Sequence, residues 1–176
     1  MRKFMLLLSL VALAAPIAAF ADNAPSPAQT ANQICAAAKA QMGATPFAQA
    51  YGTNASKSNA FGKCVSKNAK NGQQAVTNAS KSCTTQQADP NFATNHGGKT
   101  FDQFYGGTGK GSSKNAFGKC VSQAVQSSVA ATGKASAAAL KSCKASMKAD
   151  KTAFATLYGT GKDALGKCVA AKSGAK

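Results

Sequence analysis

The sequence predicts an all-α protein of three disulfide-paired helical hairpin repeats, packed as a small bundle or a short array. Three observations support this prediction. The chain carries an even number of cysteines behind an export signal. A phrase around alternate cysteines occurs three times. Within that phrase, apolar residues recur at the spacing of one helical face.

The N-terminal segment 1–21 has the pattern of a secretory signal peptide. It begins with the charged residues Arg2 and Lys3, continues with an apolar stretch, and ends with small residues around Phe20. No second long apolar run follows, so we expect no transmembrane segment. The sequence therefore predicts a secreted or periplasmic protein, in which residues 22–30 form an N-terminal linker.

The cysteines are expected to form disulfides, because compartments beyond the cytoplasmic membrane are usually oxidising. They are Cys35, Cys64, Cys83, Cys120, Cys143 and Cys168. Large apolar residues are sparse among alanine, serine, glycine, asparagine and lysine, so the chain can bury little apolar surface per residue ordered. We therefore expect cross-links to supply stability that the core lacks.

Three repeat units are assigned to residues 31–72, 73–130 and 131–176. Each contains in its second half the phrase Asn-Ala-Phe-Gly-Lys-Cys-Val-Ser or a close variant, at 59–66, 115–122 and 163–170. Pairing within units joins Cys35 to Cys64, Cys83 to Cys120 and Cys143 to Cys168, each worth about 3 to 4 kcal/mol in the chain-entropy model. A rival scheme joins Cys64 to Cys83, Cys120 to Cys143 and Cys35 to Cys168. We prefer the first scheme because an open stack would keep the two ends of the chain apart.

Each unit is expected to contain two helices with a short helical turn between them. In the last helix Phe61, Cys64 and Val65 share one face, and the other units repeat this spacing. Residues at the preceding position are expected to cap that helix through their side chains, and they are Asn59, Asn115 and Asp163. The intervening turns carry aromatic pairs at i and i+4, namely Phe47 with Tyr51, Phe101 with Tyr105, and Phe154 with Tyr158.

Glycines at two kinds of position are expected to affect the helices. The apolar face of Val121, Val125 and Val129 is expected to end where Gly133 breaks the helix. The glycine of the Phe-Gly-Lys-Cys or Leu-Gly-Lys-Cys phrase recurs in all three units. Since glycine disfavours a helix by about 1 kcal/mol relative to alanine, its recurrence predicts a close helix approach beside each disulfide.

The phrase Tyr-Gly-Thr followed by Asn-Ala-Phe-Gly-Lys-Cys-Val resembles a short repeat of uncharacterised exported bacterial proteins. The resemblance covers most of residues 31–171, and it implies export and repetition. It implies no activity. The third unit departs from the phrase with Asp163 and Leu165, and the second contains an insertion at 89–99.

The charge predicts a partner of opposite sign. After residue 21 the chain has 19 lysines, five aspartates, no arginine and no glutamate, a formal balance of +14. Such a chain attracts anionic polymers and surfaces without selectivity. One lysine stands directly before the second cysteine of each unit, and we expect an array to present these three in a row. Two further lysines follow glycine-rich turns that can hold an anion. The five candidates are Lys63, Lys119, Lys167, Lys110 and Lys162.

Catalytic and metal sites are not predicted. The chain has a single histidine, His96, which we expect to be an exposed loop residue, and no glutamate for general acid or base work. No closely spaced cysteine pair suggests a metal site, and no cofactor is expected. The leading hypothesis is a non-enzymatic exported protein that associates with envelope polysaccharide, lipid or nucleic acid. The alternatives are a structural or protein–protein interaction module of the cell envelope, whose repeated Phe and Tyr face a partner chain, and a small hydrolase.

Overall fold

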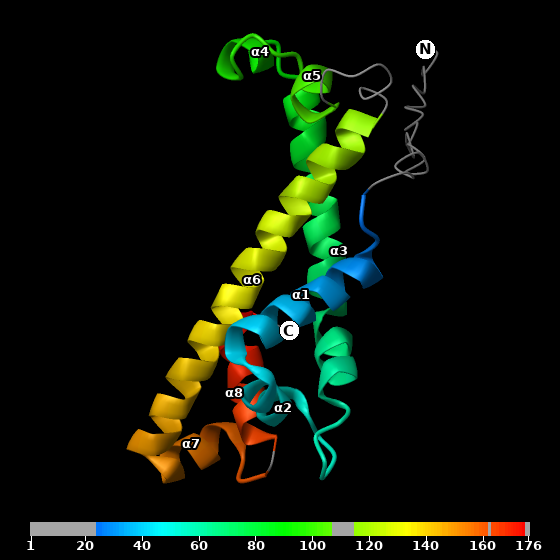
Figure 1. The fold of residues 1–176 in the computed structure, drawn as a ribbon. Coiled ribbons are helices and arrows are strands. Elements are labelled where there is room, and N and C mark those ends of the chain that lie inside the picture. Colours follow the sequence, from blue (N-terminus) through cyan, green and yellow to red (C-terminus); the bar gives the residue numbers. More distant parts are fainter. Residues whose placement is uncertain (1–23, 107–114, 162, 175–176) are drawn as a thin grey trace, which may run out of the picture.

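A computed structural model describes residues 24–106, 115–161 and 163–174, and the expected signal peptide lies outside this part of the chain. Every regular element in it is a helix (Figure 1), which confirms the predicted all-α class. The helices are α1 (Pro27–Met42), α2 (Ala44–Tyr51), α3 (Ala60–Gln87), α4 (Phe92–Asn95), α5 (Phe101–Gly106), α6 (Ala116–Ala149), α7 (Lys151–Tyr158) and α8 (Ala164–Ser173). Within the described ranges, no helix combines the length and apolar character needed to span a membrane.

The three disulfides follow the pairing within units. Cys35–Cys64 joins α1 to α3, Cys83–Cys120 joins α3 to α6, and Cys143–Cys168 joins α6 to α8. The preferred scheme is therefore confirmed and the rival scheme is wrong. Helices α3 and α6 each carry two cysteines, which belong to two different disulfides. The disulfides therefore link α1, α3, α6 and α8 in series.

Helix α1 begins inside the segment that the sequence assigned to a linker. Ser26 accepts a hydrogen bond from the backbone N–H of Gln29, and the Gln29 side chain accepts one from the backbone N–H of Ser26. This capping box, with Pro27 at the first helical position, starts the helix within the expected linker, whose last four residues are helical.

The two long helices run across the boundaries between units. Helix α6 has 34 residues and continues through Gly133, so the predicted break there is wrong. Gly133 is buried against α1, and a β-carbon on it would lie 3.0 Å from the β-carbon of Ala37. In α3, a β-carbon on the buried Gly72 would lie 2.9 Å from the backbone nitrogen of Ala31. Both glycines therefore let α1 pack closely between α3 and α6, which offsets their low helix propensity.

The buried residues form two clusters, one toward each end of an elongated molecule (Figure 1). The first contains Cys35–Cys64 and Cys143–Cys168, and it is built from α1, α2, α6, α7, α8 and the start of α3. We call this the double-disulfide end. The second surrounds Cys83–Cys120 where α3 ends and α6 begins, beside α4 and α5. We call it the single-disulfide end. Helix α1 contributes Ile34 to the second cluster and Ala38 to the first.

The first and third sequence units pack against each other at the double-disulfide end. Helix α2 contacts α8, and α1 contacts α6. The buried Tyr51 of α2 faces Ser136 of α6, but its hydroxyl makes no hydrogen bond of good geometry. Burial raises the pKa of Tyr51, and the nearby Ser136 hydroxyl partly counters that rise.

The expected capping side chains stand at helix N-termini but do not cap them. Asn59 precedes α3, yet its side-chain oxygen accepts a hydrogen bond from the backbone N–H of Thr53 at 3.0 Å, and its amide donates to the Thr53 hydroxyl at 2.8 Å. Neither Asn115 nor Asp163 makes a side-chain cap. The prediction was wrong because it considered only the helix, whereas Asn59 closes the loop before it.

Candidate functional site

The five lysines predicted from the sequence do not form one row. Lys119 lies at the single-disulfide end and donates a hydrogen bond to the Gly106 carbonyl oxygen at 3.0 Å. Lys63 and Lys167 lie beside Cys64 and Cys168 at the double-disulfide end, where Lys63 is exposed and Lys167 forms an ion pair with Asp163 at 3.2 Å. This ion pair is the main reason why the pKa of Asp163 lies below its usual value. Lys110 and Lys162 lie outside the described residues.

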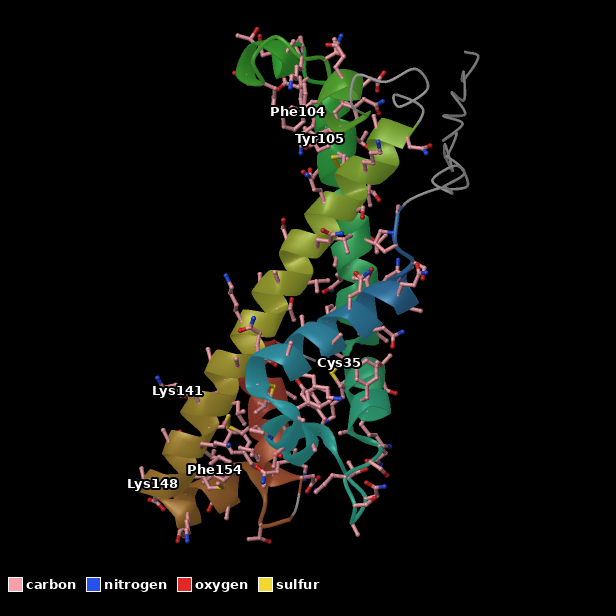
Figure 2. All side chains as sticks on the ribbon, in the orientation of Figure 1. Cys35, Phe104, Tyr105, Lys141, Lys148 and Phe154 are labelled. Carbon is pink, nitrogen blue, oxygen red and sulfur yellow. A yellow bond between two sulfur atoms is a disulfide. The ribbon has the colours of Figure 1, made fainter. Side chains whose placement is uncertain are left out.

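A different set of lysines is aligned along α6. Lys134, Lys141, Lys144 and Lys148 are all exposed, and at 3.6 residues per turn they fall within an arc of about 80°. At a rise of about 1.5 Å per residue, Lys134 and Lys148 are about 21 Å apart along the helix. Figure 2 shows Lys141 and Lys148 projecting from the same side of α6. We call these four residues the α6 lysine stripe.

Helix α3 carries a second alignment. Lys63, Lys67, Lys70 and Lys81 fall within an arc of about 60°. Neither α3 nor α6 contains an acidic residue. The sequence prediction missed both alignments because it compared equivalent positions of the three units. The intervals of seven in Lys134, Lys141 and Lys148 were the signal that could have revealed the α6 lysine stripe.

The α6 lysine stripe leads to a cavity with a volume of about 730 Å³. This terminal groove lies between α2, the end of α6, α7 and α8. It is lined by Gln49, Lys57, Met147, Lys148, Lys151, Phe154, Ala155, Gly159, Thr160, Gly161, Ala164 and Leu165. Five of these side chains are apolar, three are lysines, and none is acidic. The terminal groove is therefore an apolar recess with a positive rim, and Lys148 belongs to both the rim and the stripe.

One lysine of the terminal groove, Lys57, belongs to the loop before α3. Lys57 has a left-handed backbone conformation with φ of 59°, which is uncommon for a residue with a β-carbon. Its ammonium donates a hydrogen bond to the carbonyl oxygen of Gly52 at 2.8 Å. That bond bridges the loop, and Lys57 lines the same recess as residues of α7 and α8.

One predicted anion-binding turn contributes to the same recess. Gly159, Thr160 and Gly161 line the terminal groove, and Gly159 ends α7 with a positive φ of 87°. Its backbone N–H donates to the carbonyl oxygen of Ala155 at 2.7 Å. The turn therefore forms a wall of the recess, while Lys162, on which its predicted anion contact depended, is not described.

The single-disulfide end carries an aromatic cluster. His96 stacks on Phe92 with ring centroids 3.8 Å apart, and its Nδ1 lies 2.8 Å from the Phe92 carbonyl oxygen. The predicted exposed histidine is thus half-buried. Phe104 and Tyr105 complete the cluster (Figure 2), and the Tyr105 hydroxyl donates to Gln86 at 2.7 Å. Partial burial raises the pKa of Tyr105.

In the described residues, no three His, Cys, Asp or Glu side chains gather closely enough to hold a metal ion. No protein-family model, curated protein or solved structure matches this chain.

Proposed function

We propose that this chain is an exported, non-enzymatic basic protein that binds an anionic polymer or surface of the cell envelope through its lysines. The observation that supports the proposal most strongly is the α6 lysine stripe, four exposed ammonium groups on one face of a helix without acidic residues. Three disulfides fit an oxidising compartment such as the periplasm or the exterior of the cell.

The pattern of charges favours binding over solubility alone. A surface that only needs solubility gains from interspersed charges of both signs. Lys144 and Lys148 are instead at positions i and i+4 of a helix, as are Lys63 and Lys67. Like charges at this spacing destabilise a helix by about 0.2 to 0.5 kcal/mol. A bound polyanion would neutralise that repulsion.

The absence of arginine after residue 21 favours a partner recognised by charge rather than by shape. Lysine is a point charge on a flexible stem, whereas arginine recognises planar groups at two points. Binding should therefore release counterions and weaken steeply with salt.

The interaction-module hypothesis receives less support. It required the repeated aromatic residues to face a partner, but four of them are buried, namely Phe47, Tyr51, Phe101 and Phe154, while Phe61 is 37% exposed. The hydrolase hypothesis also receives little support, because the His96 ring is packed against Phe92 and its Nδ1 faces a backbone carbonyl oxygen.

The test compares two variants that lose the same charge. The stripe variant replaces Lys134, Lys141, Lys144 and Lys148 by glutamine. The control replaces four exposed lysines on other elements, and these are Lys39, Lys81, Lys99 and Lys172. Binding of the oxidised protein to heparin, to phosphatidylglycerol vesicles and to duplex DNA is measured at about 50 and 500 mM salt. Electrostatic attraction is weakly screened at the first concentration and strongly screened at the second.

We expect the stripe variant to lose at least tenfold in affinity for the preferred probe, with a shallower salt dependence. The control should lose clearly less. Affinity that is the same at both salt concentrations would contradict electrostatic binding. Equal losses in the two variants would contradict the α6 lysine stripe as the binding surface.

A further inference from the structure

We infer that the terminal groove binds the acyl chain of a single-chain anionic amphiphile, with the anionic head group at its lysine rim. This inference rests on the proposed function, because it assigns a chemical class to one anionic partner of the lysine-rich surface.

The size and lining of the terminal groove suit an acyl chain. Its volume of about 730 Å³ lies within the usual range of small-molecule sites, about 300 to 1,000 Å³. Met147 comes from α6, Phe154 from α7 and Leu165 from α8, so three helices supply apolar side chains. Met147 is 38% exposed although it is apolar and lines the recess, which leaves apolar surface for a ligand to cover.

The charges around the terminal groove select an anionic head group. Lys148 and Lys151 stand on either side of the corner between α6 and α7, and Lys57 faces them from the loop before α3. Two carboxylates adjoin lining residues in sequence. Asp150 accepts a hydrogen bond from the backbone N–H of Ala153 at 2.9 Å and caps α7, and Asp163 forms an ion pair with Lys167 at 3.2 Å. Neither of them lines the recess. A carboxylate or phosphate head group would therefore meet ammonium groups at the rim while its chain enters the apolar interior.

The repeat explains why this recess exists in the third unit. Leu165 occupies the position of Phe61 in the first unit and Phe117 in the second. In the first unit, the ring of Phe61 lies 6.3 Å from the ring of Phe47. Phe154 is the counterpart of Phe47, so the smaller Leu165 leaves space beside it that a phenyl ring would occupy.

The same comparison provides a conservative way to block the site. Leu165→Phe restores the residue of the other two units and changes no charge, so the fold has already accommodated it at equivalent positions. Leu157→Phe is the matched control, because Leu157 lies on α7, is 73% exposed and does not line the terminal groove. Ala155→Leu is a second blocking variant on a different wall.

The experiment is calorimetric titration of the oxidised protein with dodecanoate below its micellar concentration, with dodecyl maltoside as the neutral probe. We expect one dodecanoate per protein, and at least tenfold weaker binding in Leu165→Phe and Ala155→Leu. Leu157→Phe should bind as the unmodified protein does. Replacing Lys148 and Lys151 by glutamine should weaken dodecanoate binding and leave the binding of dodecyl maltoside unchanged.

Dodecanoate binding that is unaffected in both blocking variants would overturn the inference, as would equal affinity for the charged and neutral probes. Heparin binding in the same samples separates this result from the proposed function. If heparin still binds in a salt-dependent way while dodecanoate does not bind, the inference fails and the proposed function stands. If neither binds, both fail. Circular dichroism of each variant checks that the helices have formed.

Discussion

The two ends of the molecule hold their helices together by different means. At the double-disulfide end, two sequence units share one buried cluster and contribute one disulfide each. At the single-disulfide end, one disulfide and a group of aromatic rings hold α5 against α6 and the end of α3. The comparison teaches that equivalent repeats need not have equivalent support, because a unit is stabilised by what packs on it as well as by its own cross-link.

The largest expected effect comes from removing one disulfide at each end. Cys83→Ser with Cys120→Ser, and Cys143→Ser with Cys168→Ser, open loops with sequence separations of 37 and 25 residues. The chain-entropy model gives about 3.5 to 4 kcal/mol of lost stability for both. We expect the first pair to lose hydrogen-exchange protection in α5, and the second to retain it in α1 and α2, whose own disulfide remains.

Chemical denaturation measures the two free energies, and peptide-resolved hydrogen exchange locates the loss. Unchanged protection of α5 after removal of Cys83–Cys120 would show that the aromatic cluster alone supports that end.

An intermediate effect on stability is expected when the glycine of the repeated phrase is replaced by alanine. The sign of the effect should differ between two equivalent positions. A β-carbon on Gly166 would overlap the carbonyl oxygen of Ala50, whereas one on Gly62 would have no neighbour within 4 Å. Gly166→Ala should therefore destabilise the protein by about 1 to 3 kcal/mol, because α8 must move away from α2. Gly62→Ala should stabilise it by about 0.5 to 1 kcal/mol through helix propensity.

Urea denaturation of both variants tests the pair. Two changes of the same sign would mean that the contact between α2 and α8 is looser than the structure shows.

The smallest effect concerns the buried phenol that faces the third unit. Because the Tyr51 hydroxyl lacks a hydrogen bond of good geometry, Tyr51→Phe should change the free energy of unfolding by less than about 1 kcal/mol at neutral pH. At high pH the free energies of unfolding of the unmodified protein and of Tyr51→Phe should diverge. The folded-state pKa of Tyr51 is raised above the ordinary value of 10.0, so its contribution is complete below pH 10 and is lost as pH rises through the folded-state pKa.

The free energy of unfolding should thus fall more steeply above pH 10 in the unmodified protein than in Tyr51→Phe. Parallel curves would indicate that the phenol ionises without a penalty. Tyr105→Phe, at the other end, provides the comparison for a tyrosine that does have a hydrogen-bond partner.

The sequence was informative about contacts within a unit and uninformative about contacts between units. Disulfide pairing and the apolar face of Val121, Val125 and Val129 follow from spacing along one helix or hairpin, and the structure confirms both. Gly133 was misread because its low helix propensity is local, whereas the packing of α1 that favours it comes from residues about a hundred positions away. The recurrent glycine illustrates the same limit, since the predicted close approach occurs at Gly166 and is absent at Gly62.

The candidate site was only partly predictable for a similar reason. The excess of lysine and the turn at Gly159 were visible in the sequence, and Leu165 was recognised as a departure from the repeat. A recess made by α2, α6, α7 and α8 requires the first and third units to meet, and no periodicity in the chain indicates that contact.

The placement of the cross-links also has a consequence for proteolysis. Each break between helices that the structure describes lies inside a disulfide loop, whereas the described segments between loops, residues 65–82 and 121–142, are wholly helical. Proteases cleave irregular backbone most readily. A cut at residues 52–59, for example, would leave both fragments joined through Cys35 and Cys64. Such a nicked molecule would run as intact protein on a gel without reductant and as two pieces with it.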